Sequence, residues 1–403
     1  MTAHLDETTP SPRPAEVFRA FLALGLTSFG GPTAHIGYFR TAFVDERRWL
    51  TAELFARYFA FAQVLPGPTS SQLGMLIGLH RAGLGGMGAA WVAFTLPSAL
   101  LMVAAGLIGL GLADQRSGWL IGLAAAAVGV VAHAVWSMAT TLLPDGRTRL
   151  LAALGFVVVA LMPGALGQLL TLAVGGIGGF VLLAGRAQPM DFDAPPLPKG
   201  LATFAAVGFA TVLVFLVVAA LVPLGRDVTM LAGILYSGTF IVGGGHVVLP
   251  LLDGTVVQPG FVDRETFLAG YGVAQAMPGP LFSIGAFLGA AGDDGNIGFA
   301  LLCLVAIFLP STLLMAATLP AWHRLQSWPA VQPALAGMAA AVTGLLAAAL
   351  VVVLVPEAIT SPGTAAIAMG VTAVVFSKRL PAWLVVLAAA IAGALLDGVG
   401  WLR

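Results

Sequence analysis

The chain has 403 residues, of which 59% are hydrophobic and only 9% are charged, and its mean hydropathy is +0.98. Soluble globular domains carry roughly 25% charged residues, so this composition excludes a water-soluble protein and predicts an integral protein of the lipid bilayer. The formal net charge is zero and no basic stripe is present, which excludes a nucleic-acid-binding protein.

The first apolar segment is too short to cross a membrane. Residues 1–15 are polar, and we expect a cytoplasmic tail there, with no cleaved signal peptide. The apolar run 16–29 has 14 residues, and at about 1.5 Å per residue such a helix cannot span roughly 30 Å of hydrocarbon. A helix break is predicted where the run ends, because glycine and proline follow it, at Gly30, Gly31, Pro32 and Thr33.

Two further short runs, 54–65 and 69–80, are separated by Pro66, Gly67 and Pro68. Proline removes amide donors and glycine permits a sharp reversal, so the stretch "QVLPGP" from Gln63 predicts a second break. The residues after it suit the N-cap and first turn of a helix, namely Thr69, Ser70 and Ser71. A helix N-terminus inside a membrane presents unpaired N–H groups and partial positive charge, which together favour an anion. The alternative interpretation is a tight turn between two membrane helices.

Five later runs are long enough to span the bilayer as helices: 88–112, 119–143, 201–223, 298–320 and 331–355. The glycine cluster 175–179 lies inside another apolar run and predicts close helix packing. Residues 186–200 are polar and rich in proline, which predicts a cytoplasmic linker. The expected organisation is therefore a tail (1–15), a first repeat (16–185), the linker (186–200), a connecting transmembrane helix (201–227) and a second repeat (228–403).

The sequence repeats itself after about 212 residues. "QVLPGP" recurs as "QAMPGP", so the candidate site residues of the second copy are Gln275, Pro278, Gly279 and Pro280. The same shift aligns Glu53 with Glu265. "FTLPSALL" at 94–101 meets "IFLPSTLL" at 307–314, and the first glycine-rich break meets Gly244, Gly245 and His246. Many transporters are built from such repeats, with the substrate site at the repeat interface.

Arginine counts give the two repeats opposite orientations. The region 35–85 contains Arg40, Arg47, Arg48, Arg57 and Arg81, whereas the matching region 246–295 contains only Arg264. By the positive-inside rule the first region is cytoplasmic and the second is outside, and the additional segment 201–223 supplies the inversion. The predicted fold is an all-α polytopic membrane protein of two inverted-topology repeats, each with two broken, re-entrant helix hairpins and about four further membrane segments.

We expect the breaks to meet near the membrane midplane and to bind an anion through their N–H groups and nearby hydroxyls, including that of Ser283. Gln63 and Gln275 either line this site or hold helices together. His246 and His35 either contact the anion, exchange a proton or cap a helix end. Arg40 and Arg57 either attract the anion or only set topology, and Glu53 and Glu265 either gate the site or stabilise helix dipoles.

Enzyme signatures are weak. No HExxH, GxSxG or P-loop motif occurs in a suitable context, and Asp and Glu are scarce inside the apolar runs. The single cysteine, Cys303, excludes a disulfide framework and a cysteine metal site, so neither a metal nor a cofactor is expected. A transporter is favoured over the alternative of an intramembrane enzyme acting on a lipid phosphate.

Four motifs in order resemble the chromate ion transporter family in its long form with two homologous halves. They are "FGGPTAHIGYFR" at 29–40, "QVLPGPTSSQLG" at 63–74, "GGGHVVLPLL" at 243–252 and "QAMPGP" at 275–280. The resemblance implies export of chromate and chromate resistance, with sulfate as the alternative oxyanion of the same shape. His246 stands where the first half has Pro32, which predicts an asymmetric site.

The membrane potential predicts the direction of transport. Moving one charge across 100 mV is worth about 2.3 kcal/mol, so a dianion that leaves an inside-negative bacterial cell gains about twice that. Efflux across the cytoplasmic membrane therefore needs no coupling ion, although proton antiport through His246 is an alternative. The sequence is also compatible with a homodimer.

Overall fold

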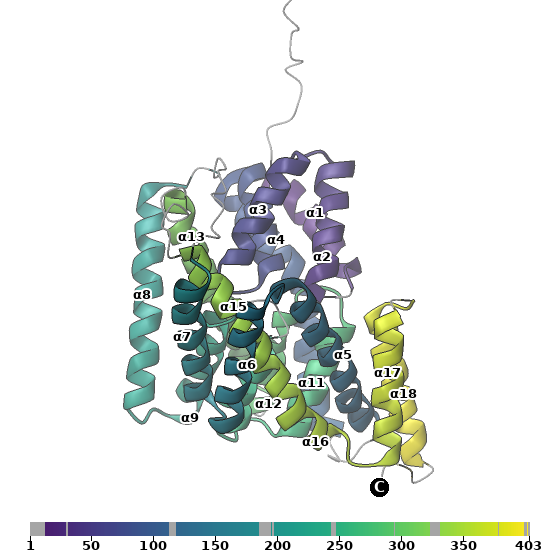
Figure 1. Ribbon diagram of the computed structural model, residues 1–403. Helices are drawn as coiled ribbons and strands as arrows, with labels where there is room; N and C mark the ends of the chain where they lie inside the picture. The colour runs from purple at the N-terminus through teal and green to yellow at the C-terminus, as the bar shows by residue number, and fades with distance from the viewer. Residues whose placement is uncertain are drawn as a thin grey trace, which may run out of the picture.

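The computed structural model describes residues 13–29, 31–112, 118–184, 195, 197–242, 247–293, 295–322, 331–377, 379–398 and 401. Within these residues every regular element is a helix (Figure 1). Six of the described helices are long and apolar enough to cross a membrane. The chain is thus an all-α polytopic membrane protein, as its composition predicts.

The helices of the first half are α1 (Pro14–Thr27), α2 (Gly31–Arg40), α3 (Ala52–Val64), α4 (Thr69–Leu112), α5 (Gly118–Leu142), α6 (Gly146–Leu161) and α7 (Ala165–Leu182). α8 (Lys199–Leu221) connects the halves. The helices of the second half are α9 (Arg226–Thr239), α10 (Val248–Leu252), α11 (Arg264–Ala276), α12 (Ile284–Gly292), α13 (Ile297–Thr318), α15 (Val331–Ala348), α16 (Val355–Ala358), α17 (Pro362–Ser377) and α18 (Ala382–Gly398).

The short helices gather at opposite ends of the molecule. In Figure 1, α1, α2 and α3 lie at the upper end, whereas α9, α11 and α12 lie at the lower end. Both groups contain a proline–glycine–proline break: α3 ends at Val64 and α4 begins at Thr69, while α11 ends at Ala276 and α12 follows a 3₁₀ turn at 281–283. α4 is interrupted where Ala82 and Gly83 leave helical geometry, and Gly78 before this interruption packs against Gly86 and Ala90 after it. α4 therefore consists of two helices, 69–81 and 84–112, that lie against each other. These short elements hold the two breaks inside the bundle.

The two halves interlock through their long helices. α15 of the second half packs against α6 and α7 of the first, and α5 of the first half packs against α17 and α18 of the second. Glycines allow the close approach: a methyl group on Gly337 of α15 would overlap Gly175 and Gly179 of α7, and one on Gly122 of α5 would meet Gly393 of α18. The predicted packing role of the 175–179 glycine cluster is therefore confirmed.

Candidate functional site

The first PGP break (Pro66–Pro68) is fastened to the second half. Gly67 has φ +122°, a conformation that favours glycine, and its amide donates to the carbonyl of Ile241, 2.7 Å away, beyond the end of α9. Gln72 of α4 turns back so that its Nε2 donates to the Pro66 carbonyl at 2.9 Å. A methyl group on Gly67 would overlap Ser311 of α13. The break thus lies directly against α13.

The second PGP break (Pro278–Pro280) makes the reciprocal contacts. Gly279 has φ +93°, and its amide donates at 3.0 Å to the carbonyl of Ser28, just beyond the end of α1. A methyl group on Gly279 would meet Ser98 of α4, whose Oγ lies 2.7 Å from the Oγ of Ser283. Each break therefore packs against the other half's long proline-containing helix.

Ser98 and Ser311 occupy matching positions in the repeat. Each follows a proline inside its helix, Pro97 in α4 and Pro310 in α13, and each donates its hydroxyl at 2.9 Å to a carbonyl three residues earlier. Trp91 of α4 meets Phe308 of α13 edge-on at 5.5 Å between ring centroids. The interface between α4 and α13 is therefore apolar at its aromatic contact and polar beside each break.

Several buried polar atoms near the breaks have no hydrogen-bond partner among the described residues. They are Ser28 Oγ, His35 Nδ1, Ser71 Oγ, Gln72 Oε1, Trp91 Nε1 and Thr95 Oγ1. Leaving a buried donor or acceptor unpaired costs about 1 to 3 kcal/mol, and native proteins leave few such groups. All six lie in the first half, so that half has unused hydrogen-bonding capacity in the interior.

The sequence-predicted residues divide between interior and surface. Ser70, Ser71, His35, Gln275 and Ser283 are buried, and Thr69 is partly buried. Gln63, Arg40, Glu53 and Glu265 are exposed, and Arg57 is half-exposed. The predicted hydroxyls and one of the two glutamines thus lie in the interior, whereas the charged candidates lie at or near the surface.

The exposed candidates have local partners. Arg57 forms an ion pair with Glu53 one turn away on α3. Glu53 and Glu265 both lie in the first turn of their helices, where a carboxylate favours the helix dipole. The side chains of Thr51 and Asp263 cap the same two helices by accepting from Leu54 N at 3.1 Å and Thr266 N at 2.8 Å. This geometry supports the structural interpretation of both glutamates.

Some predicted positions lie outside the described residues, namely Gly30, Gly244, Gly245 and His246. The side chains of Pro32 and Thr33 also lie outside the described part of the chain, although their backbone belongs to α2.

His35 lies close to the second break. Its ring meets Phe94 of α4 edge-on at 5.1 Å between centroids, and its Nε2 lies 3.2 Å from the carbonyl oxygen of Ser28. The Gly279 amide donates to that same oxygen. A histidine that donates through Nε2 leaves Nδ1 as an acceptor while the ring is neutral, and this nitrogen would become a second donor in the imidazolium form.

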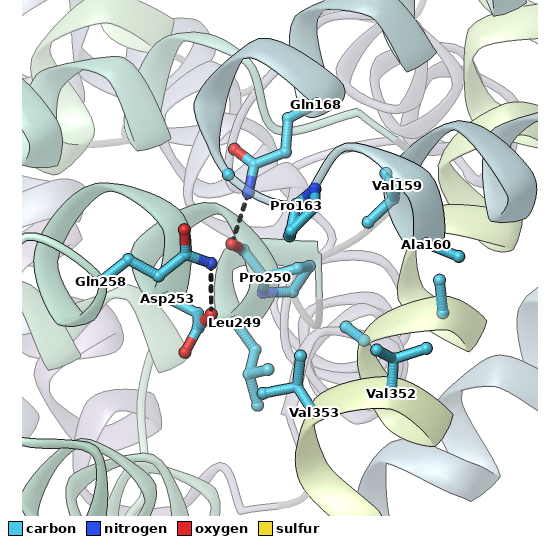
Figure 2. Close-up of a pocket in the computed structure, with 13 residues that line it drawn as sticks. Val159, Ala160, Pro163, Gln168, Leu249, Pro250, Asp253, Gln258, Val352 and Val353 are labelled. Carbon is cyan, nitrogen blue, oxygen red and sulfur yellow. Dashed lines mark hydrogen bonds between the residues drawn. The ribbon is translucent and has the colours of Figure 1, made fainter.

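A separate pocket lies between the α6–α7 connection and α10 (Figure 2). Gln168 donates to the Pro250 carbonyl at 2.6 Å, and Gln258 donates to Asp253 at 3.1 Å. Arg264 pairs with Asp253 at 3.3 Å and with Glu357 at 3.1 Å. The other lining residues are apolar, and no group of three metal-ligating side chains occurs among the described residues. The two ion pairs of Arg264 connect α11 with the end of α10 and with α16, which indicates a structural role.

Sequence reasoning missed four further interior hydroxyls. Ser98 and Ser311 belong to the recurring "LPS" motif, which could have marked them, but only as part of a repeat. Ser28 and Thr95 carry no local signal, because hydroxyls are common in membrane helices.

Comparison with known proteins gives a consistent result. The family model "Chromate transporter" matches residues 15–180 and 228–394. A probable chromate transport protein of Synechococcus elongatus is 31% identical, with 93% of each chain covered. A chromate transport protein of Cupriavidus metallidurans is 29% identical over 96% of this chain and 94% of its own. Another chromate transport protein, from Pseudomonas aeruginosa, is 29% identical over 85% and 82% respectively. No solved structure matches this chain.

Proposed function

The chain belongs to the chromate transporter family, and from that premise we propose that it exports chromate from the cytoplasm through the interface between its two halves. The observation that carries the proposal is the reciprocal contact of the breaks: Gly67 donates to Ile241 and Gly279 donates to Ser28. A site at the interface of two inverted repeats suits alternating access, because both faces of the membrane can reach it in turn.

The breaks also suggest how the anion is bound. In this conformation the amides of Gly67 and Gly279 are occupied by carbonyls of the other half. When one half rocks against the other, these amides lose their partners and become donors for an oxyanion, together with the first-turn hydroxyls Ser70 and Ser71 and the amide of Gln275. After the anion is released, the two amides again donate to the carbonyls of Ile241 and Ser28. The bound anion and the closed interface therefore compete for the same donors.

The proposed topology puts the N-terminus and the end containing α1, α2 and α3 in the cytoplasm. Support comes from the arginine bias and from the opposite placement of the short helices (Figure 1). Export then follows the membrane potential, which favours the exit of a dianion by about 4.6 kcal/mol per 100 mV, twice the value for one charge. At about 1.4 kcal/mol per decade, this sustains a gradient of about a thousandfold.

The deciding experiment is chromate flux from proteoliposomes in which the potential and the pH gradient are clamped separately. We expect efflux that rises with inside-negative potential at equal pH, with protein-free liposomes as the control. Flux that needs a pH gradient at zero potential would instead establish proton antiport. Excess sulfate in the same assay measures how far the site distinguishes the two tetrahedral anions. Chromate flux no greater than that of protein-free liposomes under every condition would refute the function.

A further inference from the structure

Two buried hydroxyls of the first half adjoin the second PGP break without a hydrogen-bond partner among the described residues. Ser28 and Thr95 come from the first half, are 0% and 2% exposed, and have hydroxyls without a partner among the described residues. The carbonyl of Ser28 accepts the Gly279 amide at 3.0 Å. Thr95 follows Phe94, whose carbonyl oxygen lies 3.2 Å from the position that a Gly279 methyl group would take. Both residues therefore adjoin the break.

The unpaired state of Thr95 is unusual for this protein. A buried threonine in a helix ordinarily bonds the carbonyl four residues earlier. Thr171, Thr239 and Thr343 do so here, at 2.8, 2.7 and 3.0 Å. Thr95 does not, although it too lies within a helix, α4. Its hydroxyl is therefore free to serve another group.

The direction of the Thr95 side chain follows from its helix. Residues three apart lie on one face of a helix, so Thr95 shares a face of α4 with Ser98. Ser98 in turn lies 2.7 Å from Ser283 and packs against Gly279. The face that bears Thr95 is consequently the face turned to the second half.

The repeat does not duplicate these hydroxyls. When "FTLPS" is aligned with "IFLPS", Thr95 matches Phe308. At the first break the carbonyl that accepts the glycine amide belongs to Ile241, whereas at the second break it belongs to Ser28. Gln72 likewise falls on Ile284 under the shift of 212. At the counterparts of Thr95, Ser28 and Gln72 the second half thus supplies apolar side chains, and duplication alone does not explain these polar groups.

We propose that Ser28 and Thr95 are anion-contacting residues, which bind a tetrahedral oxyanion at the second PGP break from the side of the first half. The inference rests on the proposed function and names donors for the same site. A hydroxyl can rotate to donate to an oxyanion, and a hydrogen bond to a charged group is stronger than one between neutral groups. The anion thereby satisfies two groups that the closed protein leaves unpaired.

The test compares Thr95→Val with Thr343→Val. Both threonines are 2% exposed and the substitution is the same, but the Thr343 hydroxyl already has its partner on its own helix. We expect Thr95→Val to raise the half-saturating chromate concentration for flux at least tenfold and to reduce the rise in Tm caused by chromate, without lowering the Tm of the free protein. Thr343→Val should leave the half-saturating concentration unchanged. Ser28→Ala should behave as Thr95→Val does.

A conservative variant separates binding from folding. Thr95→Ser keeps the hydroxyl and should restore near wild-type half-saturation, even if Thr95→Val proves unstable. Equal impairment of Thr95→Ser and Thr95→Val would overturn the inference, and so would a Thr95→Val protein whose half-saturation and chromate-dependent Tm match the wild type. Failure of the wild-type protein to move chromate would instead overturn the proposed function.

Discussion

Gln275 and Gln63 occupy matching places in the repeat, yet Gln275 is 5% exposed and Gln63 lies at the surface. The difference arises from neighbouring helices: α5 and α18 cover α11, whereas α3 packs mainly against α4. Gln275 also hydrogen-bonds Tyr271 one turn earlier. The local sequence motif therefore marks both glutamines as candidate site residues, but the packing of the surrounding helices determines which of them faces the interior.

The two glutamines should respond differently to truncation. Gln275→Ala removes a buried hydrogen bond, worth about 0.5 to 1.5 kcal/mol, and should lower both Tm and the rate of chromate flux. Gln63→Ala, a surface change, should stay within about 0.5 kcal/mol of the wild type and keep its flux. Flux is measured at equal protein content per liposome. Equal losses for both variants would contradict the assignment of Gln275 alone to the interior.

At the scale of elements, the sequence predicts the helices and their breaks well. α3 ends two residues before Pro66 and α11 ends two residues before Pro278, because proline acts on its own helix. The partners of each helix could not be predicted in this way. Gly337 meets glycines more than 150 residues earlier in the chain, and nothing local to α15 indicates that it crosses α7.

That crossing makes Gly337 sensitive to substitution. Gly337→Ala should force α15 away from α7 and reduce the free energy of unfolding by about 1 to 3 kcal/mol, because the methyl group would overlap backbone that has no room to move. Gly370→Ala in α17 is the matched control, since open space surrounds that glycine. Thermal unfolding in detergent measures both variants. A Gly337→Ala protein as stable as Gly370→Ala would show that the helices do not cross this closely.

For the whole molecule, composition predicts the membrane class and the repeat predicts two similar halves. The contacts that join the halves were beyond sequence reasoning, because they depend on segments that meet only after folding. Ser98 and Ser283 are 185 residues apart, and each looks ordinary in its own helix. Thr95 is likewise ordinary in sequence, and only burial without a partner distinguishes it.

Opposite orientation of the halves can be measured with cysteine labelling. Glu53 and Glu265 are aligned, exposed and located at the starts of α3 and α11. In a Cys303→Ala background, a membrane-impermeant maleimide applied to intact cells should label Glu265→Cys but not Glu53→Cys, and Glu53→Cys should react only in inverted vesicles. Unsubstituted protein is the control, because Cys303 is 0% exposed. Labelling of both cysteines from one face would exclude inverted repeats.

The reciprocal bonds at the PGP breaks also set an order for biosynthesis. The Gly67 amide finds its acceptor in Ile241, which leaves the ribosome 174 residues later. At about 5 to 20 residues per second, roughly 10 to 35 s pass between the synthesis of Gly67 and that of Ile241, and the Gly67 amide lacks this acceptor during that time. The interval between the synthesis of Ser28 and that of Gly279 is longer still. The contacts of both PGP breaks are therefore completed only once the second half is being synthesised.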